Sequence, residues 1–108
     1  MKTLRLTSLG FTRDEAMDFG DDGNYFKGYN YKGVPVSYLR QCGEIYLSFR
    51  LDYLKNPNNV KTWNDDTDRF NGVSPDQVTK EALLETAEKV LAFAKENGFV
   101  LANSVRER

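Results

Sequence analysis

The fold is decided by a central stretch in which apolar and polar residues alternate. Residues 25–53 read YFKGYNYKGVPVSYLRQCGEIYLSFRLDY. In the last part of this stretch the odd positions from Ile45 to Tyr53 are apolar or aromatic, whereas the even positions are mostly polar. A period of two is typical of a β-strand that buries one face. We therefore predict a strand here, and two further strands before it over residues 25–31 and 34–41.

Two tight turns determine how these strands pair. A Lys-Gly dipeptide at residues 32–33 and a Cys-Gly dipeptide at residues 42–43 separate the three runs. Glycine in the second position is what a type I′ hairpin turn prefers. The first turn pairs Tyr29 with Val36, and the second turn pairs Val36 with Phe49. Both hairpins then place their apolar residues on one face, and a slip of one residue would turn a strand over.

A long helix is predicted after the strands, from Pro75 to Asn97. Ser74 is a natural N-cap, Gln77 completes a capping box, and Gly98 supplies a left-handed stop. Apolar residues recur at helical spacing, so we expect the stripe that they form to cover the apolar face of the sheet. The members of this stripe are Leu83, Leu84, Ala87, Val90, Leu91 and Ala94.

The two ends of the chain carry weaker patterns. Leu4 and Leu6 predict a short strand, and Thr12 with Glu15 predicts a short helix over residues 13–19. The apolar tail at residues 99–102 is suited to a further strand or to a cap on the core. Together the patterns predict one α+β domain over residues 1–108. We expect a three- or four-stranded antiparallel β-meander with one long C-terminal helix packed on one face.

Composition excludes several classes of chemistry. The 108 residues include no His and a single Cys, Cys42. These counts exclude an internal disulfide, a structural zinc site with four Cys or His ligands, and nucleophiles activated by His. No glycine-rich phosphate-binding motif occurs. We therefore expect a non-enzymatic protein that has no cofactor.

Charge and hydropathy restrict the partners and the compartment. Lys and Arg number 15, Asp and Glu number 16, and the net charge is −1. This balance argues against a partner held mainly by bulk charge, such as duplex DNA or an anionic membrane. The N-terminal residues do not read as a secretion signal, so we expect none, and the sequence has no apolar run that could span a bilayer. We expect a cytoplasmic protein, because a lone Cys is typical of a reducing compartment.

The face of the sheet opposite the helix carries the first candidate site. The predicted register places Phe26, Leu39 and Tyr46 side by side on it, with Lys32 and Arg50 near them. An apolar patch with a polar rim is typical of a protein-binding surface, and Tyr and Arg are frequent among the residues that contribute most binding energy. Two other occupants of this outer face stay open. One is a second copy of the chain in a symmetric homodimer, and the other is the apolar N-terminal segment.

A long connection between the last predicted strand and the helix carries the second candidate site. The segment from Asn56 to Gly72 is long for a compact domain, and long loops are often functional. It combines aromatic residues with carboxylates, which suits a contact with a basic partner. The candidate residues in this loop are Trp63, Asp65, Asp66, Asp68 and Phe70.

We interpret the chain as a small protein–protein interaction module that occupies a partner's surface. Its small size and the classes of chemistry that its composition excludes suit an inhibitor or adaptor encoded by a phage or another mobile element. One alternative is a single-stranded nucleic-acid-binding domain, in which Phe26 and Tyr46 stack on bases. The other is a protein that binds a divalent cation in the acidic loops at residues 18–24 and 64–68. Neither loop matches the spacing of an EF-hand.

Overall fold

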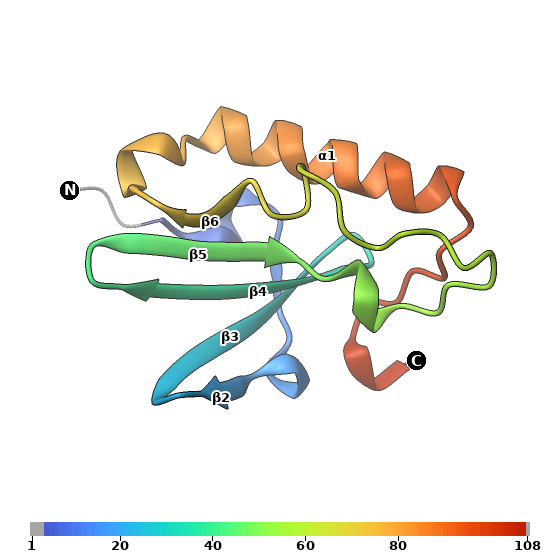
Figure 1. Cartoon of the computed structure of the whole chain (residues 1–108), viewed down its shortest axis with the longest axis horizontal. Coiled ribbons are helices and arrows are strands. Elements are labelled where there is room, and N and C mark those ends of the chain that lie inside the picture. The colour runs from blue at the N-terminus through green and yellow to red at the C-terminus, as the bar shows by residue number, and fades with distance from the viewer. Residues whose placement is uncertain (1–3, 108) are drawn as a thin grey trace.

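The computed structural model describes residues 4–107 and confirms the predicted α+β class. The strands are β1 (Thr12–Arg13), β2 (Phe19–Asp21), β3 (Asn24–Tyr31), β4 (Val34–Gln41), β5 (Glu44–Phe49) and β6 (Phe70–Val73). All pairs are antiparallel, in the order β1-β3-β4-β5-β6, and β2 also pairs with β3. The helix α1 (Lys80–Glu96) lies along one face of the sheet (Figure 1). Short 3-10 turns are η1 (Leu6–Leu9), η2 (Glu15–Met17), η3 (Leu51–Tyr53), η4 (Pro75–Gln77) and η5 (Val105–Glu107).

The three central strands have the predicted register. Tyr29 of β3 pairs with Val36 of β4, which pairs in turn with Phe49 of β5. At the two turns the residue before glycine has a positive φ, 50° at Lys32 and 53° at Cys42. A type I′ turn requires this conformation at both of its central positions. The alternation of the sequence and its two turns are therefore sufficient to define this part of the sheet.

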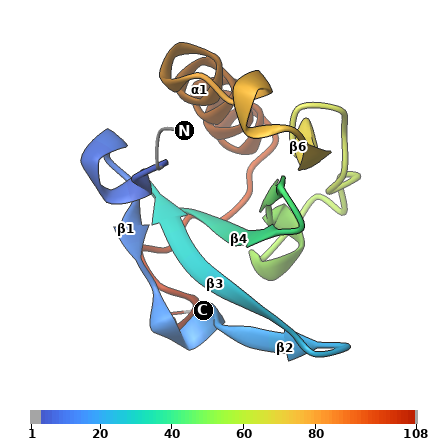
Figure 2. The same ribbon diagram turned by 90° about the vertical axis from the view of Figure 1, so that its left-hand side faces the viewer.

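The amino-terminal third differs from the prediction. Residues 6–9 form the 3-10 turn η1 and not a strand, and the helix predicted over residues 13–19 is only η2, with β1 before it and β2 after it. A third turn, with φ of 51° at Asp22 and 81° at Gly23, connects β2 to β3. The hairpin of β2 and β3 projects away from α1 (Figure 2). The sheet thus extends beyond the three central strands at both edges.

The core lies between α1 and the sheet. Every member of the predicted apolar stripe is buried except Leu84, which is partly buried. Val36 and Leu47 face the helix from the sheet and are fully buried. Phe11 packs against Tyr31, with 4.8 Å between ring centroids. The apolar N-terminal segment therefore joins the core on the helix side and does not fold over the outer face.

The α-helix begins later than the sequence pattern predicts. Ser74 does form the predicted capping box, but it caps the short turn η4. At Val78 the backbone leaves helical geometry, and this side chain is buried. Thr79 is the N-cap of α1, and its hydroxyl accepts a hydrogen bond from the backbone N–H of Ala82 at 3.1 Å. No helix within residues 4–107 is both long and apolar enough to cross a bilayer.

Two segments cover the middle of the outer face. Residues 14–18 form an arch against β3, and they approach Gly28 so closely that a Cβ there would overlap the Met17 side chain. The C-terminal tail follows α1 and reaches the same strand. Its Ala102 carbonyl accepts a hydrogen bond from the side chain of Asn30 at 2.7 Å. The middle of the outer face, at Gly28 and Asn30, is therefore covered.

Candidate functional site

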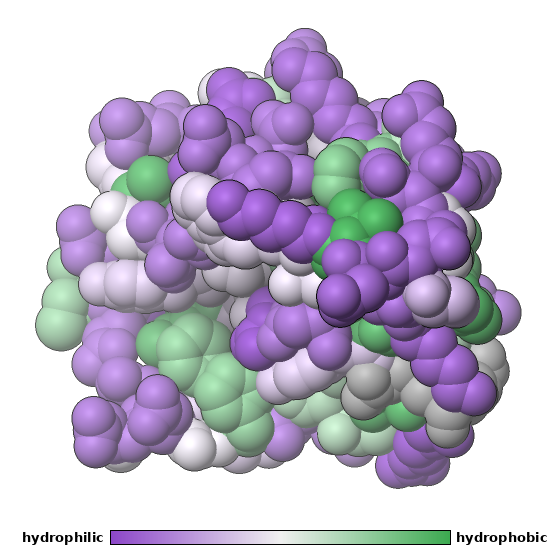
Figure 3. Space-filling view, turned by 45° about the vertical axis from the view of Figure 1, so that its right-hand side comes forward, coloured by the Kyte–Doolittle hydropathy of each residue, from purple (hydrophilic) through white to green (hydrophobic). Residues whose placement is uncertain are grey.

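One end of the outer face carries Leu39 and Tyr46 of the predicted apolar patch. Leu39 and Tyr46 pair across β4 and β5, and both are partly buried. The Tyr46 hydroxyl donates to the Glu44 carboxylate at 2.9 Å, and this hydrogen bond raises the pKa of Tyr46. Phe26 stacks on Phe19 of β2, with ring centroids 4.7 Å apart and planes 5° apart. A space-filling view shows a green patch at lower left, on the side where Figure 1 places β2 and β3 (Figure 3).

Two of the predicted site residues lie elsewhere. The Lys32 ammonium is 3.0 Å from a carboxylate oxygen of Glu88 on α1, which places Lys32 on the helix side of the molecule. Phe70 is only 2% exposed and pairs with Leu47 in the core. The reason is that Phe70 belongs to β6, a strand that the sequence analysis did not predict, and alternation turns this side chain inward. Neither residue contributes to the outer face.

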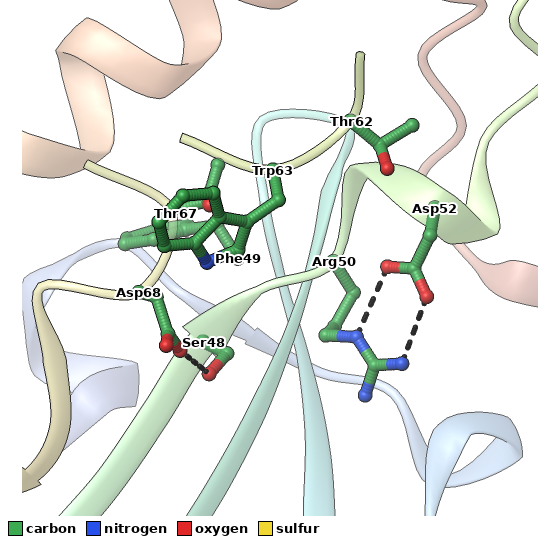
Figure 4. Close-up of a pocket in the computed structure, with 8 residues that line it drawn as sticks. All are labelled: Ser48, Phe49, Arg50, Asp52, Thr62, Trp63, Thr67 and Asp68. Carbon is green, nitrogen blue, oxygen red and sulfur yellow. Dashed lines mark hydrogen bonds and ion pairs between the residues drawn. The ribbon is translucent and has the colours of Figure 1, made fainter. Parts of the chain in front are cut away.

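A pocket brings Arg50 of the first candidate site together with Trp63 and Asp68 of the second. It has a volume of about 300 Å³ and lies at the end of β5, where the connection over residues 54–69 passes back across the strand (Figure 4). We call it the Trp63 pocket. Its lining residues are Ser48, Phe49, Arg50, Asp52, Thr62, Trp63, Thr67 and Asp68.

Hydrogen bonds within the loop hold Trp63 at the edge of this pocket. The side-chain oxygen of Asn64 accepts from the backbone N–H groups of Asp66 at 2.9 Å and Thr67 at 3.1 Å. The buried Thr67 is in turn tied to β5, because its carbonyl accepts from the N–H of Phe49 at 2.9 Å. Trp63 itself is 51% exposed. A fixed loop therefore presents a large aromatic side chain to solvent.

Arg50 is fixed in the pocket by its own neighbours. Its Nε and Nη2 donate to the two carboxylate oxygens of Asp52 at 3.0 and 2.8 Å, and its guanidinium lies 4.4 Å from the ring centroid of Tyr53. The turn η3 brings Asp52 back to this position directly after β5. The hydrogen bonds that Arg50 donates to Asp52 raise the pKa of Arg50. The pair is a planar, bidentate and neutral unit.

Asp68 supplies a different kind of group on the opposite side. Its Oδ1 accepts from the Ser48 hydroxyl at 2.8 Å, and its Oδ2 has a longer contact of 3.4 Å with the amide of Asn71. None of the ion pairs among residues 4–107 involves Asp68. The indole of Trp63 reaches toward Asp68 from above (Figure 4). The Trp63 pocket therefore combines an aromatic surface with a carboxylate whose charge has no cationic partner.

The remaining acidic residues do not form a second centre. Asp65 is exposed and Asp66 is partly buried, and neither lines the pocket. In the other acidic loop, Asp18 is held by Arg13 through two hydrogen bonds of 2.7 and 2.8 Å. In the part of the chain that the structure describes, no group of three or more Cys, His, Asp or Glu side chains is arranged to hold a metal ion.

Sequence reasoning found Arg50, Trp63 and Asp68 separately but missed that they meet. It also missed Ser48, which belongs to the outer face by alternation, and Asp52. The alternation predicts a strand that continues to Tyr53 and so places Arg50 and Asp52 on one face. In the structure β5 ends at Phe49, and the turn η3 brings Asp52 to Arg50 instead. A second groove of about 640 Å³ lies between η1, the ends of β4 and β5, and the start of α1. No sequence pattern indicated it.

Comparisons with known proteins gave no match to this chain. We found no protein-family model, no curated protein and no solved structure that matches the chain.

Proposed function

We propose that the chain is a protein–protein interaction module that binds its partner through the Trp63 pocket and the adjoining outer face. The observation that carries this proposal is that the half-exposed indole of Trp63 and the fixed guanidinium of Arg50 line one pocket. Trp, Tyr and Arg are the residues that most often contribute large shares of binding energy at interfaces. The apolar side chains of Leu39 and Tyr46 extend the same face.

The rigidity of the site supports a binding role. Arg50 is held by Asp52 and Tyr53, and the Trp63 loop is held by Asn64 and Thr67. Binding to such a surface loses less side-chain entropy than binding to a mobile one. A volume of about 300 Å³ is at the small end of ligand pockets, which suits one side chain of a partner better than a cofactor.

The placement of the cations favours a protein over single-stranded nucleic acid. Arg50 and Lys32 are each paired with a carboxylate of the chain itself. A site for single-stranded nucleic acid combines stacking aromatics with a groove of cations that follow the phosphates. Phe26, which would stack on a base in the nucleic-acid alternative, stacks on Phe19. We further propose a cytoplasmic inhibitor or adaptor role, because the exposed free thiol of Cys42 suits a reducing compartment.

Photo-cross-linking from chosen positions tests the proposal. A photoreactive amino acid is placed at Lys61, next to the Trp63 pocket, and in a matched chain at Glu85 on the exposed side of α1. Each chain is irradiated in a lysate of the organism that encodes it. We expect one protein to be captured from position 61 but not from position 85, and Trp63→Ala to abolish this capture.

Three results would contradict the proposal. One is capture of the same proteins from both positions, and another is capture that Trp63→Ala leaves unchanged. The third is a captured species that nuclease removes, which would favour the nucleic-acid alternative. A purified preparation of the captured protein then serves in all further binding measurements.

A further inference from the structure

We infer that the Trp63 pocket receives an arginine side chain of the partner protein. The inference rests on the proposed function and goes beyond it, because it states the chemistry of the group that enters the pocket. The first argument is charge. Arg50 and Asp52 neutralise each other through two short hydrogen bonds, so the charge left among the residues that line the pocket is the carboxylate of Asp68.

The carboxylate of Asp68 has acceptor capacity to spare. Two carboxylate oxygens offer about four lone-pair positions in total. The Ser48 hydroxyl occupies one of them at 2.8 Å, and the contact with Asn71 is long at 3.4 Å. A partly buried carboxylate without a cationic partner is complementary to an incoming cation. An incoming carboxylate would instead have to displace Asp52 from Arg50.

The indole of Trp63 is the second feature of the pocket that favours a cation, after the carboxylate of Asp68. Cations are attracted to the faces of aromatic rings, and Trp attracts them most strongly. The chain already shows this property, because the Lys61 ammonium lies 5.7 Å from the centroid of the Trp63 ring. A guanidinium is flat, stacks on an aromatic face and donates parallel N–H groups to a carboxylate, whereas an ammonium is a compact point charge. The pairing of an indole with Asp68 therefore fits arginine better than lysine.

A titration of the ¹⁵N-labelled full chain with small peptides tests the inference directly. The probe is the capped tripeptide Gly-Arg-Gly, compared with Gly-citrulline-Gly, which keeps the shape and loses the charge, and with Gly-Lys-Gly. Trp63 is the sole tryptophan of the sequence, so its indole N–H provides a unique signal. We expect the arginine peptide to shift this signal and the amides of Ser48 and Thr67, with saturation in the range of about 1–10 mM.

Matched variants separate the role of the charge from effects on folding. Asp68→Asn keeps the size of the side chain and its acceptor for Ser48. It should weaken the binding of the arginine peptide by about tenfold or more. Asp76→Asn, at an exposed carboxylate outside the pocket, should leave the affinity unchanged. The amide spectrum of each variant reports directly whether the chain is folded. The comparison between arginine and citrulline needs no variant.

The inference is overturned if the arginine peptide causes no shift, or if the citrulline or lysine peptide binds equally well. This failure differs from failure of the proposed function. A Trp63-dependent protein partner together with no response to the arginine peptide would overturn the inference and leave the proposed function in place. A response to the arginine peptide without any Trp63-dependent protein partner would overturn the proposed function and support the ligand chemistry of the pocket.

Discussion

Gly28 lies where the arch of residues 14–18 crosses β3, and it has no room for a side chain. A Cβ at this position would overlap the Cβ of Met17 and the carbonyl oxygen of Asp14. Because one of these atoms belongs to the backbone, a change of rotamer cannot relieve the overlap. We predict that Gly28→Ala lowers the free energy of unfolding by about 1–3 kcal/mol. Urea denaturation measures this difference.

Gly20 in β2 provides the control for that substitution. The nearest atom to a Cβ there is the carbonyl oxygen of Asn24 at 3.6 Å, which is ordinary contact. Gly20→Ala should change the stability by less than about 0.5 kcal/mol. If Gly28→Ala were as well tolerated as Gly20→Ala, the arch would not lie against β3 as described.

Asp18 connects the arch to the β2–β3 hairpin through several hydrogen bonds. Its carboxylate accepts from the guanidinium of Arg13, from the backbone N–H of Gly28 at 2.7 Å, and from the Tyr25 hydroxyl at 3.1 Å. Arg13 also donates to the carbonyl of Gly28 at 2.9 Å. Hydrogen bonding to Arg13 is the main reason that the pKa of Asp18 lies well below its usual value. The negative charge is therefore favoured in the folded state.

The depressed pKa of Asp18 gives a pH dependence of known sign. Asp18→Asn should cost about 1.5–3 kcal/mol of stability at pH 7, because it removes hydrogen bonds to a charged group. The unfolded chain takes up a proton near its ordinary pKa of about 4, before the folded chain does. The stability that Asp18 adds is thus complete above about pH 4 and falls as the pH drops toward the folded-state pKa.

Urea denaturation of both chains at pH 7 and pH 3 tests this dependence. The difference in free energy of unfolding between wild type and Asp18→Asn should be smaller at pH 3 than at pH 7. Asp21→Asn, an exposed position in β2, should show little difference at either pH. A difference for Asp18→Asn that grows on acidification would contradict the assignment.

At the scale of elements, the structure differs from the sequence pattern in where the α1 helix begins. The pattern places the N-cap at Ser74, whereas the structure places it at Thr79. Thr79→Ala should therefore destabilise the protein by about 1 kcal/mol. Thr79→Ser keeps the oxygen that accepts from Ala82 and should be close to wild type. Thermal unfolding of the three chains checks this, and equal stability of Thr79→Ala and wild type would contradict it.

The elements that the sequence predicts are those whose signals are local. Alternation and two Gly-containing turns define β3, β4 and β5, and the apolar stripe defines the buried face of α1. The region over residues 13–19 has a capping pattern that favours a helix. The contacts that decide its structure come from Gly28 on another strand, which no local pattern reveals. The strand β6 has only four residues and contains Gly72, so its β signal is weak.

The candidate site shows the same limit. Arg50 was found from the outer face and Trp63 from the acidic loop, as parts of two separate surfaces. Their meeting depends on the path of residues 54–69, which is set by the turn at Asn64 and by the hydrogen bond from Phe49 to Thr67. The second of these contacts joins segments that are far apart in the sequence. Residue type therefore indicated which side chains could bind, but not that they share one pocket.

At the scale of the whole molecule, the C-terminal tail holds the two ends of the chain together. Phe99 is buried in the core, and the tail then reaches the buried carboxylate of Asp14. This carboxylate accepts from the Ser104 hydroxyl at 3.1 Å and from the Val105 N–H at 2.9 Å. A chain that ends at residue 103 would lose both of these donors to Asp14.

We predict that this shortened chain loses about 1–3 kcal/mol of stability, because two hydrogen bonds to the Asp14 carboxylate are lost. Urea denaturation of the two chains provides the measurement. Ser104→Ala, which leaves the Val105 N–H in place, should lose less. Equal stability of the shortened and full-length chains would show that the tail does not hold Asp14.

The central claim is that the partner binds at the Trp63 pocket, and calorimetric titration with the purified partner tests it most directly. Trp63 and Tyr25 are both large aromatic side chains that are more than half exposed, at 51% and 57%, but they lie in different parts of the molecule. We predict that Trp63→Ala weakens binding by at least about thirtyfold, whereas Tyr25→Ala changes it by less than about threefold. The opposite order, or no effect of Trp63→Ala, would contradict the claim.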